Sequence, residues 1–218
     1  MSKMKIIERI HKIGLVPVLR ATSAKEALII ADAIIAGGVT VLEVTMTVPG
    51  AIQVIEQLLQ HHGEKLLVGA GTVLDAETAR SCLLAGAQFI VSPALDLRTI
   101  ELCRRYSVPV MPGALTPTEI VTAWQAGADV VKVFPCSALG GAKYLKALQG
   151  PLPQIQLIPT GGVSLSTAAE FLSAGAFALG VGSDLVDAKA AAEGRTEIIT
   201  ENARKYIGIV QEFRAGNK

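Results

Sequence analysis

Short apolar runs alternate with amphipathic segments along nearly the whole chain, and this alternation predicts a repeated strand–helix unit. The apolar runs are near-continuous, which is typical of parallel strands buried on both faces. We expect strands at residues 15–21, 39–46, 66–73, 88–94, 108–115, 128–135, 154–159 and 177–181. We expect helices at residues 24–36, 49–63, 76–86, 97–106, 117–127, 142–148, 167–174 and 193–213.

Capping residues mark the predicted helix ends. Ser23 and Asp75 are N-cap candidates, whereas Pro49 and Pro117 suit the first helical turn. Glycines follow several of the predicted helices, as expected for residues just past a helix C-terminus. Eight strand–helix units without a GxGxxG turn after the first strand favour an α/β (β/α)8 TIM barrel over an open doubly wound sheet. We therefore expect a single domain, a barrel over residues 1–218.

Composition excludes several classes of partner. The chain has 218 residues, a net charge of +1 and no basic stripe, so we expect no nucleic-acid binding. The longest apolar region, residues 27–48, is interrupted by Asp32, two glycines and Glu43, so we expect no membrane span. The first ten residues carry no apolar secretory segment, and the three cysteines form no CxxC pair. Both observations predict a cytoplasmic protein with reduced thiols.

Two charged residues lie inside apolar strands. Lys132 follows Val130-Val131, and Glu43 follows Val41-Leu42. A buried salt bridge would satisfy both groups, so the pair alone does not establish catalysis. However, barrel active sites lie at the C-terminal ends of the strands, where both residues fall. Desolvation disfavours the charged ammonium, and a neutral lysine amine can form a Schiff base with a ketone, with Glu43 moving the protons.

Other strand ends complete a predicted pocket for a small anion. Arg20 ends the first strand; it is either a surface arginine or a carboxylate clamp. Glycine-rich loops follow the last two strands, at Gly161-Gly162 and Gly182-Ser183. They serve either as tight turns or as a phosphate site, which barrels usually build there. His61 and His62 fall at the end of a predicted helix and His11 precedes the first predicted strand, so all three lie away from the strand ends and we expect neither metal nor another cofactor.

Six motifs together resemble one family. They are Leu42-Glu43-Val44-Thr45, Gly69-Ala70-Gly71-Thr72-Val73, Phe89-Ile90-Val91-Ser92-Pro93, Pro112-Gly113, Val131-Lys132-Val133-Phe134-Pro135 and Pro159-Thr160-Gly161-Gly162-Val163. In this order and spacing, the chain resembles the 2-keto-3-deoxy-6-phosphogluconate (KDPG) and 4-hydroxy-2-oxoglutarate (KHG) aldolases. The resemblance implies a metal-independent class I aldolase, a (β/α)8 barrel and a homotrimer.

The resemblance also implies roles for individual residues. Lys132 matches the Schiff-base lysine, and Glu43 matches the acid–base glutamate that works with a water. Thr72 matches the residue that binds the pyruvate carboxylate, and Pro93 and Phe134 match the walls around the pyruvyl group. Thr160 matches a residue tied to stereochemical control. The phosphate end corresponds to Gly161, Gly162, Gly182 and Ser183.

One position departs from part of the family. Some members carry a carboxylate-binding arginine where this chain has Thr47, and others have threonine there with an arginine ending the first strand. The second pattern assigns the clamp to Arg20. We therefore expect cleavage of KDPG to pyruvate and glyceraldehyde 3-phosphate, with KHG as a further substrate. The alternatives are a sibling aldolase for the galactonate epimer, a phosphosugar isomerase or epimerase barrel, and a non-enzymatic binding barrel.

Overall fold

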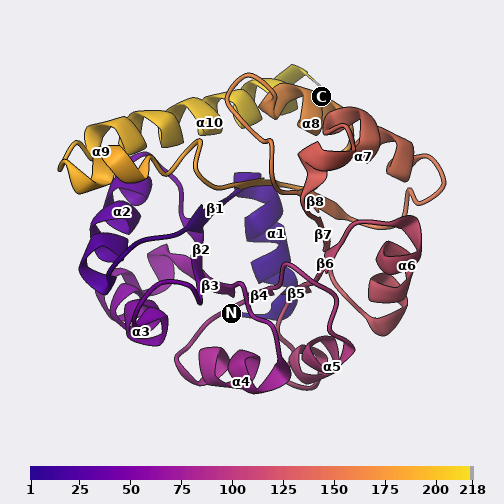
Figure 1. Cartoon of the computed structure of the whole chain (residues 1–218), viewed down its shortest axis with the longest axis horizontal. Coiled ribbons are helices and arrows are strands. Elements are labelled where there is room, and N and C mark those ends of the chain that lie inside the picture. The colour runs from indigo at the N-terminus through magenta and orange to yellow at the C-terminus, as the bar shows by residue number, and fades with distance from the viewer. Residues whose placement is uncertain (217–218) are drawn as a thin grey trace.

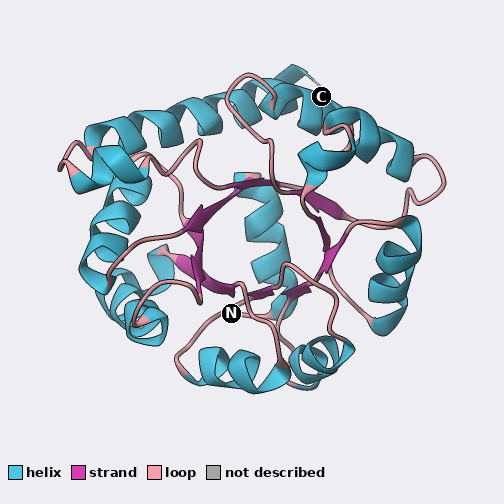
Figure 2. Cartoon of the chain, in the orientation of Figure 1, coloured by secondary structure: helices cyan, strands magenta, loops and turns pink. Residues whose placement is uncertain are grey.

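The computed structural model describes residues 1–216, in which parallel strands form a ring that helices surround (Figure 1 and Figure 2). The strands are β1 (Leu15–Leu19), β2 (Val41–Thr45), β3 (Leu67–Gly71), β4 (Ile90–Val91), β5 (Val110–Met111), β6 (Gly113–Ala114), β7 (Val131–Val133), β8 (Leu157–Pro159) and β9 (Leu179–Val181). The helices after β1 are α2 (Ala24–Ala36), α3 (Ala51–His62), α4 (Ala76–Leu84), α5 (Leu97–Arg105), α6 (Pro117–Ala126), α7 (Ala142–Gln149), α8 (Ala168–Ser173), α9 (Ala188–Ala192) and α10 (Glu197–Gly216). Two 3-10 turns, η1 (Gly63–Lys65) and η2 (Cys136–Leu139), complete the order.

The strand order closes the ring. Six strands pair in the order β5-β4-β3-β2-β1-β9, and three pair in the order β6-β7-β8. A bridge between Thr160 and Gly180 joins the end of β8 to β9. On the other side, β5 and β6 are consecutive and are separated only by Pro112. The predicted (β/α)8 barrel is therefore confirmed; of the predicted domain, residues 217 and 218 lie outside the described part.

Four elements differ from the sequence-based expectations, three of them for a local reason. The predicted strand 108–115 is divided at Pro112, which has no N–H to donate to the sheet. Pro49 lies before the helix rather than in it, because Gly50 is the N-cap of α3. The predicted helix 193–213 corresponds to α10, which begins only at Glu197, because Gly194 has a left-handed backbone and separates α10 from the unpredicted helix α9. Of the predicted strand 88–94, β4 spans only Ile90–Val91, although Gln88 and Ser92 still donate backbone hydrogen bonds to the neighbouring strands.

A further helix, α1 (Lys3–Ile13), was not predicted and lies across the ring of strands (Figure 1). Ser2 caps its N-terminus, and Gly14 ends it in the left-handed conformation. Its Ile6 and Ile10 are buried in a cluster with residues that come mainly from the first half of each strand, among them Val16, Val41 and Leu67. Helix α1 thus covers the N-terminal end of the barrel, and the C-terminal ends of the strands are left for a site.

The larger hydrophobic cluster lies between the strands and the surrounding helices. Apolar side chains of the strands, such as Leu42 and Val44, pack there with helical residues such as Ile30 and Ile55. The three cysteines are free and buried, and burial raises the pKa of Cys103 to about 12. No helix within residues 1–216 combines the length and apolar character that crossing a membrane requires.

Candidate active site

Lys132 and Glu43 reach each other across the interior of the barrel. Lys132 is the middle residue of β7 and lies in register with Gly113 of β6 and Ile158 of β8. Glu43 is the middle residue of β2, in register with Val18 of β1. The Lys132 Nζ lies 3.9 Å from the Glu43 Oε1, and the two side chains are 6% and 2% exposed. The two charges predicted from the sequence therefore form a buried pair.

The Glu43 carboxyl is in an environment that disfavours ionisation. Burial raises its pKa above the ordinary value of 4.5, against the lowering effects of Lys132 and then Arg20. Its Oε1 is buried and has no hydrogen-bond partner among the described residues. A buried acceptor without a partner costs free energy, and such atoms often mark catalytic sites. The carboxyl therefore keeps its proton to a higher pH than a surface glutamate does, which suits a group that donates and accepts protons.

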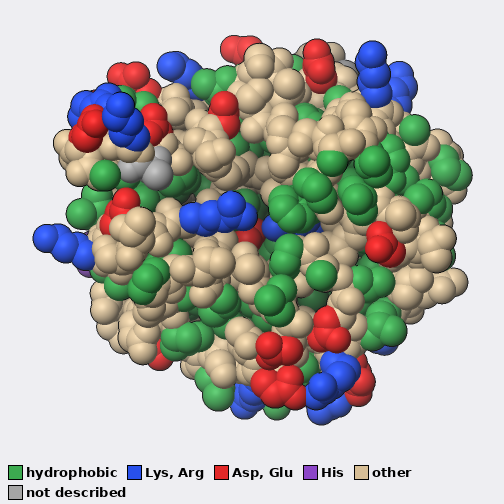
Figure 3. Space-filling model, in the orientation of Figure 1, with side chains coloured by type: hydrophobic (Ala, Val, Ile, Leu, Met, Phe, Trp, Pro, Cys, Tyr) green, Lys and Arg blue, Asp and Glu red, His purple; other side chains and the backbone are tan. Residues whose placement is uncertain are grey.

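Phe134 connects the lysine to an adjoining cavity. The Lys132 Nζ lies 5.4 Å from the centre of the Phe134 ring, and the peptide bond between Phe134 and Pro135 is cis. The ring also lines a cavity of about 130 Å³ at the C-terminal ends of β1, β7, β8 and β9. Figure 3 shows this face of the ring, with Lys or Arg side chains beside Asp or Glu at its centre.

Most of the predicted substrate-binding residues line this cavity. The predicted residues that line it are Arg20, Phe134, Thr160, Gly161, Gly162, Gly182 and Ser183. The backbone at Gly161 and Gly162 has positive φ angles of 87° and 79°, which other residues rarely adopt. A side chain at Gly162 would also lie 2.4 Å from the Ser137 Cβ. These two glycines are therefore required by the turn, and they leave backbone N–H groups accessible in the loop after β8.

Thr72 and Pro93 lie on other strand ends and do not line that cavity. Thr72 follows β3 and has a φ angle of 54°, which is rare for a β-branched residue. Such strained residues cluster at ligand-binding sites, where the surrounding fold holds them in place. Pro93 follows β4, and its carbonyl group packs closely against Gly113. Both residues are partly buried, as a wall of a substrate pocket would be.

Arg20 is an exposed side chain at the end of β1. Its charge acts on Glu43, since it contributes to lowering the pKa of that carboxyl. The preceding residue, Leu19, accepts a 3.0 Å hydrogen bond from the buried Thr45 hydroxyl. The Thr45 hydroxyl also lies 2.7 Å from that of Thr47, which is exposed. Thr45 thus links the strand end that carries Arg20 to the neighbouring strand.

The structure adds residues that the sequence analysis did not select. Val18, Val163, Gly180 and Asp184 also line the cavity. The Asp184 carboxylate accepts hydrogen bonds from the hydroxyl of Tyr206 in α10 and from the backbone N–H of Leu165. Asp184 could have been selected because it follows Ser183 in the sequence. Nothing in the sequence indicated Tyr206, because only the packing of α10 in the folded protein brings its hydroxyl to Asp184 in the loop after β9.

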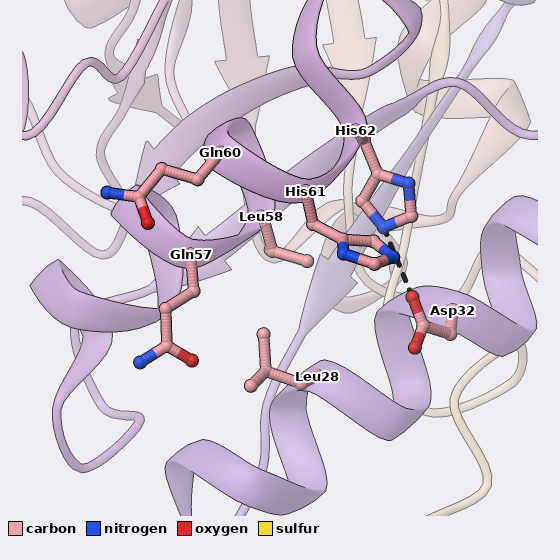
Figure 4. A pocket seen from close by; sticks show the side chains of 7 residues that line it. All are labelled: Leu28, Asp32, Gln57, Leu58, Gln60, His61 and His62. Atoms are coloured by element: carbon pink, nitrogen blue, oxygen red, sulfur yellow. Dashed lines mark hydrogen bonds and ion pairs between the residues drawn. The ribbon is translucent and has the colours of Figure 1, made fainter.

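The histidines lie away from this site, as predicted. His11 is in α1 and stacks on Phe177, with a ring separation of 4.8 Å. His61 and His62 end α3 and line a separate hollow between α2 and α3 on the outside of the helical ring (Figure 4). There His62 lies 3.1 Å from the Asp32 carboxylate. Within residues 1–216, no three His, Cys, Asp or Glu side chains are grouped in a way that could hold a metal ion.

The chain as a whole matches a known enzyme family. A model of the KDPG and KHG aldolase family matches residues 6–201. The chain belongs to this family. The 2-dehydro-3-deoxy-phosphogluconate aldolase of Treponema pallidum is 35% identical over 205 residues, which are 94% of this chain and 97% of the relative. The 2-dehydro-3-deoxy-6-phosphogalactonate aldolase of Escherichia coli is 35% identical over 201 residues, which are 92% of this chain and 98% of the relative.

A solved structure agrees with the family assignment. The KDPG aldolase of Legionella pneumophila, described with pyruvate captured as a covalent carbinolamine intermediate, superposes with a TM-score of 0.85 and is 31% identical. The match covers 91% of this chain and 96% of that one. The predicted family and the predicted aldolase class are therefore confirmed. The roles of the individual site residues stay predictions.

Proposed function

We propose that this protein is a class I aldolase that reversibly cleaves KDPG to pyruvate and glyceraldehyde 3-phosphate. The observation that carries the proposal is the buried pair of Lys132 and Glu43, 3.9 Å apart, beside a cavity lined by glycine-rich loops. An amine surrounded by apolar strands suits attack on a keto group, and a carboxyl of raised pKa suits proton transfer. Membership of the aldolase family supports the same chemistry.

In this proposal, the two ends of the substrate are held on different strand ends. The guanidinium of Arg20 and the hydroxyl of Thr72 bind the carboxylate, while Pro93 and Phe134 enclose the pyruvyl carbons. Guanidinium and carboxylate groups match in a bidentate geometry, which fixes the keto group relative to the lysine. The phosphate lies against the loops that carry Gly161, Gly162, Gly182 and Ser183. Thr160 lies between the two ends and contacts the hydroxylated carbons.

The Lys132 amine adds to the C2 carbonyl and forms a carbinolamine, and loss of water then gives an iminium. The Glu43 carboxyl donates the proton that leaves with this water. As a carboxylate, it next accepts the proton of the C4 hydroxyl while the C3–C4 bond breaks. The bond electrons pass to the iminium nitrogen and form an enamine, and glyceraldehyde 3-phosphate leaves. Protonation at C3 and hydrolysis of the imine by water release pyruvate and the free lysine.

Reductive trapping tests the nucleophile. Borohydride added with pyruvate should attach one reduced pyruvyl group per chain, and peptide mass analysis should locate it on Lys132. The Lys132→Ala variant is the control and should remain unmodified. If the wild-type protein forms no adduct, the Schiff-base mechanism is contradicted. An adduct that persists in the variant would leave the mechanism but assign the nucleophile to another lysine.

The galactonate epimer is a second candidate substrate. It is favoured by the E. coli relative, whose identity to this chain equals that of the Treponema pallidum relative. The two sugar acids differ at one hydroxyl-bearing carbon, next to the proposed position of Thr160. Values of kcat/KM for both epimers and for the unphosphorylated KHG would rank the three substrates. A preference for KHG over both phosphorylated acids would contradict the proposed phosphate site.

We also propose that the protein forms a single-domain homotrimer in the cytoplasm and serves the Entner–Doudoroff route of sugar-acid breakdown. The family resemblance supports the trimer and the pathway, and the three free cysteines fit a reducing compartment. Light scattering at several concentrations would test the trimer, because a stable trimer keeps a mass three times that of the 22.7 kDa chain on dilution.

A further inference from the structure

Gly71 in β3 lies against the Glu43 carboxyl. It ends β3 and pairs with Thr45 of β2, while Glu43 pairs with Gly69, two residues earlier in β3. A Cβ atom added to Gly71 would lie 1.8 Å from the Glu43 Oε1, 2.3 Å from its Cδ and 2.4 Å from its Cγ. The outer part of the Glu43 side chain therefore occupies the space that any side chain at position 71 would need.

The backbone of Gly71 does not itself require glycine. Its φ is not positive, unlike that of Gly161 or Gly162, so alanine can adopt the same strand conformation. The atoms that an alanine would meet belong to a flexible side chain rather than to the backbone. The strand could therefore keep its position while Glu43 moves.

We propose that Gly71 is a positioning residue, whose missing side chain sets the conformation that holds the Glu43 carboxyl beside Lys132. This inference rests on the proposed acid–base role of Glu43. A longer residue at position 71 rotates the carboxyl away from the 3.9 Å contact with Lys132. Misplacing a catalytic group by about 1 Å can reduce a rate by about 100-fold. Gly71 thereby affects the reaction without touching the substrate.

Gly69 offers a matched comparison in the same strand. A Cβ at Gly69 would lie 2.2 Å from the ring of Phe89, and its three nearest atoms all belong to that ring. Phe89 is fully buried in the hydrophobic cluster that also holds Ile6 and Ile10 of α1, where a rigid ring cannot move aside easily. We therefore expect Gly69→Ala to lower stability more than Gly71→Ala does. Conversely, Gly71→Ala should lower kcat more than Gly69→Ala does.

A double-mutant cycle isolates the contact between Gly71 and Glu43. The cleavage rate is measured for the wild type, Gly71→Ala, Glu43→Ala and the double variant, together with KM and the melting temperature. In the wild-type background, Gly71→Ala should lower kcat about 100-fold while KM changes little. In the Glu43→Ala background, the same change should lower kcat no more than about twofold, because the side chain that it displaces is gone.

Equal losses in the two backgrounds would overturn the positioning role and assign Gly71 to packing. If Glu43→Ala alone left kcat unchanged, the proposed role of Glu43 would fail instead, and that outcome is visible in the single variant. Should Gly71→Ala not fold, the double variant decides. A folded double variant supports the inference, because it identifies Glu43 as the obstacle. A double variant that is also unfolded contradicts it.

Discussion

The Nζ of Lys132 and the Oε1 of Glu43 lie 3.9 Å apart, on strands β7 and β2, with both side chains almost completely buried. At this distance the two charges attract each other but share no direct hydrogen bond. Ion pairs built for stability usually satisfy their buried atoms, whereas the Glu43 Oε1 has no hydrogen-bond partner among the described residues. The geometry therefore suits a pair that exchanges protons with a bound substrate.

Replacing Glu43 with glutamine should remove proton transfer and leave the site nearly unchanged in shape. We expect kcat for KDPG cleavage to fall by about 10²- to 10⁴-fold, the usual contribution of a positioned acid–base group. Stopped assays of pyruvate release would measure the loss. Glu77→Gln is the control, since Glu77 is exposed and pairs with Arg98 on the surface. A loss smaller than about tenfold would contradict the acid–base role.

The raised pKa of Glu43 sets the expected dependence of the rate on pH. Once the iminium has formed, removal of the C4 hydroxyl proton needs the carboxylate form, so kcat should fall as the pH drops through the pKa of Glu43 in the substrate complex. Because burial raises this pKa, the fall should lie at a higher pH than the ordinary value of 4.5. A pH profile of kcat would locate it. A fall of kcat centred at or below pH 4.5 would show that another group controls the rate.

The same shift predicts how stability changes with pH. The folded protein binds the Glu43 proton more tightly than the unfolded chain does, because burial raises the folded-state pKa above 4.5. This contribution to stability is complete below the unfolded pKa and is lost as the pH rises through the folded pKa. Glutamine cannot ionise, so Glu43→Gln should gain stability over the wild type across that range. Urea unfolding at several pH values would measure the difference in free energy of unfolding, and a pH-independent difference would contradict this account.

The strand–helix alternation and most of the site could be predicted from the sequence. Parallel strands meet at one end of a barrel, so the strand ends already indicate Arg20. Glu43 and Lys132 are the middle residues of β2 and β7 rather than strand ends, and they were indicated as single charges inside apolar strands. Helix boundaries also followed from local chemistry, as at Ser23 and Asp75, whose side chains cap α2 and α4. These features depend on spacing and on short-range hydrogen bonds, both of which can be read along the chain.

Other features depend on contacts between distant residues. The apolar face of α1 is visible as Ile6 and Ile10, yet only the closed ring provides the surface against which they pack. The contact between Gly71 and Glu43 depends on the register of β2 and β3, which a sequence pattern does not specify. Asp184 and Tyr206 are 22 residues apart, and the packing of α10 brings them together.

Arg20 should matter more for substrate binding than Thr47 does. A charge-assisted bidentate contact is worth about 1.5–3 kcal/mol, so Arg20→Ala should raise KM by about 10- to 100-fold. Thr47→Ala should change KM little, because Thr47 is exposed and Thr45 keeps its hydrogen bond to Leu19. Steady-state kinetics and the rate of pyruvate trapping would compare the two variants. Similar effects of both substitutions would contradict the assignment of the carboxylate clamp to Arg20.

Tyr206 should support the phosphate end of the site from behind. Its hydroxyl donates to the Asp184 carboxylate, which also accepts from the N–H of Leu165 and so connects the loops after β8 and β9. Tyr206→Phe removes a hydrogen bond to a charged group, and we expect a stability loss of about 1.5–3 kcal/mol. KM for KDPG should rise as the loops loosen, whereas KM for the unphosphorylated KHG should stay nearly constant.

Tyr144→Phe is the matched control for this substitution. The Tyr144 hydroxyl donates to the carbonyl of Leu115, which does not line the cavity, so its loss should lower stability without changing the preference for a phosphorylated substrate. The ratio of kcat/KM for KDPG to that for KHG is the deciding measurement, since it cancels any general loss of folded protein. A ratio that falls for Tyr206→Phe alone supports a role for Asp184 and its partners at the phosphate end. A ratio unchanged by either substitution, or lowered equally by both, would limit Tyr206 to packing α10 against the barrel.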